Sequence, residues 1–126
     1  MPFFLLGNAA LYLLLALWCT LRPHETSSGI GFEFTHPSAL SEYLTVYGGL
    51  ELGLGLYFLL GWFIPSWRRP ALGFGLVLYA SLALYRGGTL LAIDGLGTFP
   101  KAMFAVESSM TIFAVLLLKS GAGKAR

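Results

Sequence analysis

Four long, almost uninterrupted apolar runs dominate this chain and limit what it can fold into. They cover residues 3–21, 43–64, 71–93 and 101–118. Each run approaches the roughly 20 residues that a helix needs to cross a hydrocarbon core about 30 Å thick. A transmembrane β-barrel would show segments of about ten residues with alternating polarity, and these runs do not alternate. The runs predict an all-α integral membrane protein, a four-helix bundle forming a single transmembrane domain over residues 1–126.

The composition and the residues between the runs agree with this interpretation. Apolar residues make up 56% of only 126 residues and charged residues 11%, which would leave a soluble domain of this size with a surface that water hydrates poorly. Proline and positive charge end the first run at Arg22-Pro23. No Lys or Arg precedes that run, so it does not fit a secretory signal peptide, and we expect a retained helix.

The distribution of basic residues predicts the orientation, because short loops rich in Lys and Arg stay on the cytoplasmic side. One side of the predicted topology carries five of them: Arg68, Arg69, Lys119, Lys124 and Arg126. The other side carries only Arg22 and Lys101. We therefore expect a multi-pass protein of the bacterial inner (plasma) membrane with both termini cytoplasmic, an outer loop at residues 22–42 and a cytoplasmic tail at residues 119–126.

Three ionisable residues lie inside the predicted helices: Glu51, Arg86 and Glu107. Such groups cost roughly 2.5 to 3.5 kcal/mol each at membrane depth, so they need partners. Counted from the outer ends of their helices at 1.5 Å per residue, all three lie roughly 9 to 12 Å below the outer surface. Because one guanidinium can bind two carboxylates, the sequence predicts a Glu51, Arg86, Glu107 cluster within the bundle.

The cluster would carry a formal charge of minus one, so either one carboxyl is protonated or hydroxyl groups supply further donors. Polar residues within about two helical turns form the expected surrounding shell: Tyr47, Thr89, Asp94, Ser108 and Thr111. One interpretation is that the cluster only fixes helix register and rotation. The other is that it lines a cavity and binds a polar or protonatable group.

Small residues in the second run predict close helix packing. Gly49 and Gly53 have the small-xxx-small spacing that lets helix backbones approach, and Gly48, Glu51 and Gly55 share one stripe. The carboxylate face is therefore also a face of small residues, which places this helix at the centre of the predicted bundle. A glycine stripe used for homodimerisation is the alternative.

The chain contains no pattern that predicts a metal site, a cofactor or a catalytic centre. His24 and His36 lie in the outer loop without CxxC or HExxH spacing, and a solvated loop with a short extended segment at residues 31–35 is the expected structure. Pro37 allows a helix to begin there. The net charge of +2 does not indicate nucleic-acid binding.

The polar motifs resemble those of a known family. They are a Gly-Gly-Leu-Glu-Leu-Gly-Leu-Gly stretch at residues 48–55, Arg86 followed by Asp94-Gly95, and Glu107 early in the last helix. In these features the chain resembles small four-helix bacterial membrane proteins of unknown function that group with the DoxX-like superfamily. The resemblance implies a fold more than an activity, although members of the wider superfamily look like accessory subunits of membrane redox systems.

Two functional interpretations follow. The first is a non-enzymatic accessory or interaction subunit, embedded in the lipid bilayer and docked on a larger membrane protein partner. The second is a small binding or transport protein, a homo-oligomer, in which Glu51, Arg86 and Glu107 recognise a polar ligand or a proton. An enzyme is a third class, and only the same three residues could supply its acid and base chemistry.

Overall fold

All regular structure in the described part of the chain, residues 1–122, is helical in the computed structural model. The all-α class is therefore confirmed. The chain divides into two compact units, one formed by Pro2–Arg68 and the other beginning at Arg69. The last part of the predicted tail, with Lys124 and Arg126, lies outside the described residues.

Four helices are long and apolar enough to cross a membrane: Pro2–Leu21, Pro37–Phe63, Pro65–Ala92 and Thr98–Ser120. They correspond to the four runs found in the sequence. The second, third and fourth begin three to six residues earlier than the apolar runs do, because each opens with a proline in or near its first turn. Proline is tolerated there, since the first backbone N–H groups of a helix have no partner within it.

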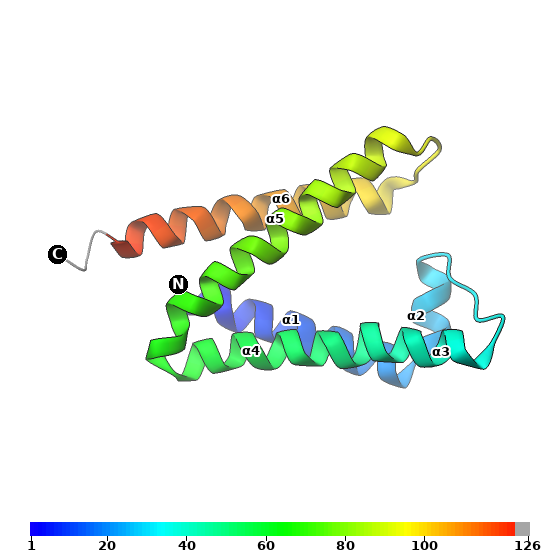
Figure 1. Ribbon diagram of the computed structural model, residues 1–126, viewed down its shortest axis with the longest axis horizontal. Coiled ribbons are helices and arrows are strands. Elements are labelled where there is room, and N and C mark those ends of the chain that lie inside the picture. Colours follow the sequence, from blue (N-terminus) through cyan, green and yellow to red (C-terminus); the bar gives the residue numbers. More distant parts are fainter. Residues whose placement is uncertain (123–126) are drawn as a thin grey trace. The chain divides into compact units, whose positions relative to one another are not determined.

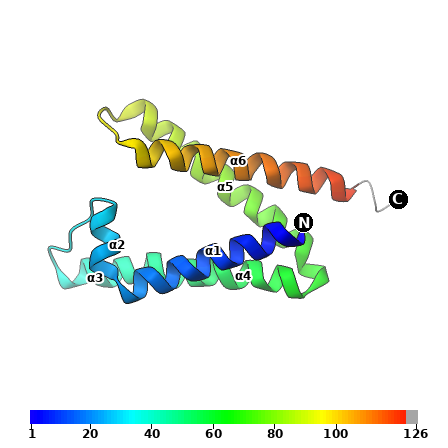
Figure 2. The same ribbon diagram turned by 180° about the vertical axis from the view of Figure 1, so that it is seen from behind.

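In the first unit, helix α1 (Pro2–Leu21) lies along a long composite helix. That helix consists of α3 (Pro37–Tyr43), a π-helical segment η1 (Leu44–Leu50) and α4 (Glu51–Phe63). Figures 1 and 2 show α1 beside α4 from opposite sides. Helix α1, whose sequence has few distinctive residues, thus packs against this composite helix.

Two glycines bring this composite helix close to α1. A Cβ atom at Gly55 would lie 2.7 Å from Leu13 Cγ and 3.0 Å from its backbone nitrogen. A Cβ atom at Gly48 would lie 2.8 Å from Thr20 Oγ1. The close approach therefore uses the stripe that also holds Glu51.

The small-xxx-small pair Gly49 and Gly53 does not make this contact. No described atom lies within 4 Å of a Cβ atom built at either position. The sequence prediction of close packing is correct for the helix, but it assigns the wrong pair of glycines. Spacing alone cannot show which of two neighbouring glycine stripes faces the partner helix.

Aromatic rings also fill the space between α1 and α4. Phe58 is fully buried, stacks on Tyr12 at a centroid distance of 5.9 Å and meets Phe4 edge to face at 6.5 Å. Leu5 is also fully buried in the same unit. These side chains form the apolar core of the helix pair.

The connection at residues 22–42, expected as a solvated loop, contains a short helix α2 (Pro23–Gly29) and the start of α3. Proline stands at the first position of both helices, where its fixed φ favours helix initiation. The His36 Nδ1 atom accepts the Ser38 backbone N–H at 3.2 Å and caps α3. The expected extended segment is an irregular turn, which Gly31 opens with a φ of 83°.

The second unit contains most of helix α5 (Arg68–Ala92), which follows a short 3-10 turn η2 (Pro65–Trp67), and helix α6 (Thr98–Ala122). The two helices are joined by a short turn in which Gly95 has a φ of 75°. A Cβ atom at Gly87 of α5 would lie 3.1 Å from Phe104 Cε2 of α6, so the helices are close near that turn.

Candidate functional site

Arg86 of α5 and Glu107 of α6 form a bidentate ion pair. Arg86 Nε donates to Glu107 Oε2 at 2.7 Å, and Nη2 donates to Oε1 at 2.7 Å. Two parallel charge-assisted hydrogen bonds of this kind fix the relative orientation of both side chains. The pair therefore sets the register of α5 against α6 near their connecting turn.

Burial makes this pair energetically important. The Glu107 side chain is 8% exposed and that of Arg86 is 29% exposed. A buried charge without a partner is strongly unfavourable, whereas a paired and hydrogen-bonded charge is tolerated. The chain can therefore place both groups in an apolar helix pair only because each compensates the other.

The hydroxyl groups expected around the cluster bind the helix backbone. Thr111 Oγ1 donates to the Glu107 carbonyl at 2.8 Å, and Thr89 Oγ1 donates to the Arg86 carbonyl at 2.9 Å. Ser108 is half-buried beside Glu107, and Asp94 is exposed after the end of α5. The sequence spacing placed these residues near the ion pair. It did not show that the two threonine hydroxyls donate to backbone carbonyls.

Glu51 is the first residue of α4 and directly follows the π-helical segment. Its Oε2 atom is buried, and it has no hydrogen-bond partner among the residues that the structure describes. Glu51 belongs to the first compact unit, whereas Arg86 and Glu107 belong to the second. Its place beside Arg86 stays a prediction.

Tyr47, expected near Glu51, belongs to a chain of aromatic contacts. It stacks on Tyr43 at a centroid distance of 4.6 Å and meets Phe32 edge to face at 6.2 Å. Phe34 meets Tyr43 at 5.2 Å and His24 at 5.2 Å. Sequence reasoning missed this cluster, although the alternation of Phe32 and Phe34 and the four-residue spacing of the two tyrosines were its signals.

The aromatic cluster is tied to α1 and α2 through Tyr43. The Tyr43 hydroxyl donates to Thr26 Oγ1 at 3.0 Å and lies 3.8 Å from Cys19 Sγ. Cys19 and Tyr43 are buried. The connection at residues 22–42 is thus anchored on the helix pair by a small polar contact.

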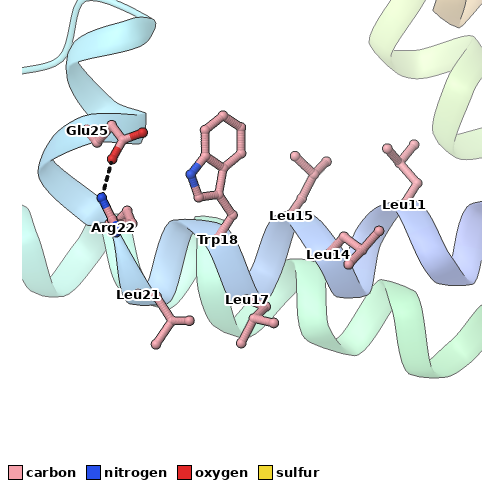
Figure 3. Close-up of a pocket in the computed structure, with 8 residues that line it drawn as sticks. All are labelled: Leu11, Leu14, Leu15, Leu17, Trp18, Leu21, Arg22 and Glu25. Atoms are coloured by element: carbon pink, nitrogen blue, oxygen red, sulfur yellow. Dashed lines mark hydrogen bonds and ion pairs between the residues drawn. The ribbon is translucent and has the colours of Figure 1, made fainter.

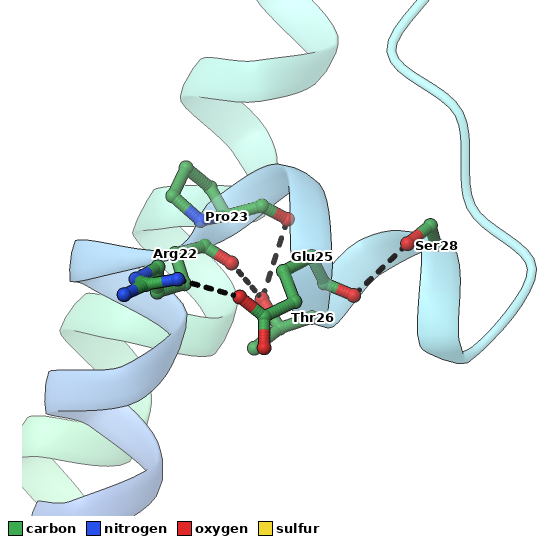
Figure 4. A network of polar contacts seen from close by, with 5 residues as sticks. All are labelled: Arg22, Pro23, Glu25, Thr26 and Ser28. Atoms are coloured by element: carbon green, nitrogen blue, oxygen red, sulfur yellow. Dashed lines mark hydrogen bonds and ion pairs between the residues drawn. The ribbon is translucent and has the colours of Figure 1, made fainter.

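Polar contacts also stabilise the corner between α1 and α2 (Figure 4). Arg22 Nη1 donates to Glu25 Oε2 at 3.1 Å, and both side chains are more than half exposed. The Thr26 hydroxyl is 2.9 Å from the Arg22 carbonyl and 3.3 Å from the Pro23 carbonyl. An exposed pair of this kind contributes little stability, so these contacts shape the corner more than they stabilise the fold.

An open, mainly apolar groove of about 610 Å³ runs along α1 next to this corner. Figure 3 shows Trp18, Leu15 and Leu11 projecting from one side of α1, with the Arg22 and Glu25 pair at one end of the row. The surface suits hydrocarbon chains, as expected of a helix in contact with lipid.

Within residues 1–122, no group of three or more His, Cys, Asp or Glu side chains could hold a metal ion. The ionisable groups of the long helices can form ion pairs and hydrogen bonds. The geometry by itself assigns no reaction to them.

Comparison with known proteins gives a family but no activity. No curated protein and no solved structure matches the chain. The family model described as Domain of unknown function (DUF4345) matches residues 1–118, which include the first compact unit, most of the second and all three ionisable residues of the predicted cluster. The chain therefore belongs to the DUF4345 family.

Proposed function

We propose that the chain is a non-enzymatic accessory or interaction subunit of a larger membrane complex. The observation that carries this proposal is the bidentate pair of Arg86 and Glu107, whose opposite charges compensate each other within one helix hairpin. An ion pair with this geometry serves to hold two helices in register.

The surfaces of the long helices support the same function. Large apolar side chains are exposed on each of them, for example Leu14, Leu56, Leu84 and Leu116. Such surfaces fit lipid and equally fit the apolar helices of another membrane protein. The long helices contain most of the described residues, so a protein partner would be recognised mainly within the bilayer.

We further propose that both termini are cytoplasmic and that the membrane is a bacterial inner membrane. The excess of basic residues around Arg68 and Arg69 and after Lys119 supports the orientation. The resemblance to the DoxX-like superfamily supports the bacterial assignment and an accessory role. In this arrangement the two compact units form one four-helix bundle, a single transmembrane domain.

The accessory function is tested by purification from native membranes. A tag on the N-terminus, gentle extraction and quantitative mass spectrometry should recover larger membrane subunits in a fixed ratio to this chain. An unrelated four-helix membrane protein with the same tag and expression level is the control. Recovery of this chain alone, or of the same proteins with the control, would contradict the proposal.

A second candidate is a small oligomeric binding or transport protein that uses Glu51, Arg86 and Glu107 for a polar ligand or a proton. Glu51 favours it, because its buried Oε2 atom has no hydrogen-bond partner in the described part of the chain and follows a π-helical segment. Such segments are frequent at functional sites.

This second function requires water access to Glu51. A cysteine at position 51, in a Cys19→Ser background, should react with a small charged thiosulfonate reagent in the folded protein. The matched control is a cysteine at Leu54, which is half-buried in the same helix. Equal protection of both positions would contradict a hydrated site.

A further inference from the structure

A second pocket, of about 440 Å³, lies between the connection after α2 and one face of α3 and η1. It lies entirely within the first compact unit. Its volume is in the range of sites for small ligands. Four aromatic rings and two carboxylates define its chemistry: Phe32, Phe34, Tyr43, Tyr47, Glu33 and Glu42.

The aromatic part of the pocket is held in place by its surroundings. Tyr43 lines the pocket and is itself buried, and its hydroxyl donates to Thr26 Oγ1 at 3.0 Å. Tyr47 stacks on it, and Phe32 and Phe34 each meet one of these rings edge to face. Because the rings support one another, they stay in position without a ligand.

The backbone fixes the segment that carries the two phenylalanines. Phe32 N donates to the Ser27 carbonyl at 2.8 Å, after Gly31 has turned the chain with its positive φ. At the other end, His36 caps α3. The wall of the pocket formed by this segment is therefore anchored on both sides.

The charge of the pocket is negative. Glu33 and Glu42 are exposed, and neither carboxylate has an ion-pair partner among residues 1–122. No Lys or Arg from the described part of the chain lines the pocket. Glu25, by contrast, lies on the same connection but is paired with Arg22.

We propose that this pocket binds an alkylammonium group. Aromatic rings attract a cation through their negative faces, and carboxylates supply the opposite charge. An alkylammonium combines a positive charge with methyl or methylene groups, so it matches both parts of the lining. An anion is repelled by the two carboxylates, and a small hard cation would not use the rings.

An alkylammonium group can come from two sources. One is a soluble amine such as choline, and the other is the headgroup of phosphatidylethanolamine or phosphatidylcholine. Part of the pocket lining belongs to the helix Pro37–Phe63, which is long and apolar enough to cross a membrane, so both a soluble amine and a lipid headgroup can reach the pocket. The experiment separates them by offering soluble amine first and amine-containing lipid second.

The full chain is purified in dodecyl maltoside, which carries no charge and no amine, and binding of radiolabelled choline is measured by equilibrium dialysis. We expect saturable binding that tetramethylammonium displaces. If the natural ligand is a lipid headgroup, added phosphatidylethanolamine or phosphatidylcholine will displace choline, whereas phosphatidylglycerol will not. If it is a soluble amine, none of the lipids will displace choline.

Three variants test the assignment of the pocket. E33Q/E42Q should weaken choline binding about tenfold or more, because it removes the charge and keeps the shape. F32L/Y47L should weaken it as well, because it removes the rings and keeps the charge. The matched control E25Q removes a carboxylate outside the pocket and should leave binding unchanged.

Three results would overturn the proposal. They are no saturable choline binding to the folded chain, unchanged binding in either double variant, and an equal loss in E25Q. Circular dichroism and thermal melting establish that each variant is folded. Glu33 and Glu42 are exposed, so their replacement leaves the apolar core intact.

Discussion

At the scale of single residues, the described part of the chain contains two ion pairs with very different surroundings. The Arg86 and Glu107 side chains are mostly withdrawn from solvent, whereas those of Arg22 and Glu25 are 69% and 56% exposed. Coulombic interactions are weak in water and strong in an apolar environment. The two arginines therefore provide a matched comparison in one protein.

Replacing Arg86 with Leu should lower the free energy of unfolding by about 3 kcal/mol, the lower end of the range for removing one partner of a buried pair. The loss arises because Glu107 stays buried without its partner. Unfolding in mixed micelles, followed by circular dichroism, measures the change. Arg22→Leu, which removes the exposed pair, should cost less than about 1 kcal/mol. Equal effects of the two substitutions would contradict the assignment.

Depth counting along the sequence predicted that Arg86 and Glu107 lie at the same level, and the structure pairs them. A pairing of this kind can be expected from sequence positions, because apolar helices have a fixed rise and a charged residue inside them needs a partner. The aromatic pocket could not be predicted in the same way. The spacing of the phenylalanines and of the tyrosines places each pair on one face, but the ring contacts depend on how the segment around Phe32 folds back on α3 and η1, which that spacing does not encode.

At the scale of helices, glycine controls how closely α1 and α4 pack. Gly55 faces the Leu13 backbone and side chain, while Gly53 faces no described atom within 4 Å. Both glycines can be read from the sequence, and small residues are correctly expected to allow close packing. The sequence does not show how the helix is rotated about its axis, so it does not show which glycine faces α1. The π-helical segment Leu44–Leu50 makes this rotation harder to predict. It has more residues per turn than an α-helix and so changes which face the following residues present to α1.

Gly55→Ala should destabilise the protein by about 1 to 3 kcal/mol, because the new methyl group would overlap Leu13 and force the helices apart. Gly53→Ala is the matched control. It should leave stability unchanged or raise it by up to about 1 kcal/mol, since alanine favours the helix. Thermal melting of the two variants in the same detergent gives the comparison. A larger loss for Gly53→Ala would show that the other stripe faces α1.

At the scale of the whole molecule, four helices that can cross a membrane and an uneven distribution of basic residues predict one topology. Ser28, in the connection at residues 22–42, and Ser66, in the 3-10 turn η2 at the start of the third span, are both exposed. They lie on opposite sides of the predicted membrane. Each can carry a cysteine without disturbing the core.

In a Cys19→Ser background, Ser28→Cys should react with a membrane-impermeant maleimide added to intact cells. Ser66→Cys should react only after the membrane is opened. A gel shift of the labelled chain measures both. The reverse labelling pattern would show that the orientation is opposite to the predicted one. Labelling of both positions in intact cells would contradict a membrane span between them.

The central prediction is that Glu51, Arg86 and Glu107 share one layer within the membrane, which would join the two compact units into one bundle. A double-mutant cycle with Glu51→Gln and Arg86→Gln tests it, with the free energy of unfolding in mixed micelles as the measured quantity. Residues in contact show coupling of about 0.5 to 3 kcal/mol, and distant residues are additive. We predict a coupling of at least about 1 kcal/mol between positions 51 and 86. Additive effects of the two substitutions would contradict the shared layer.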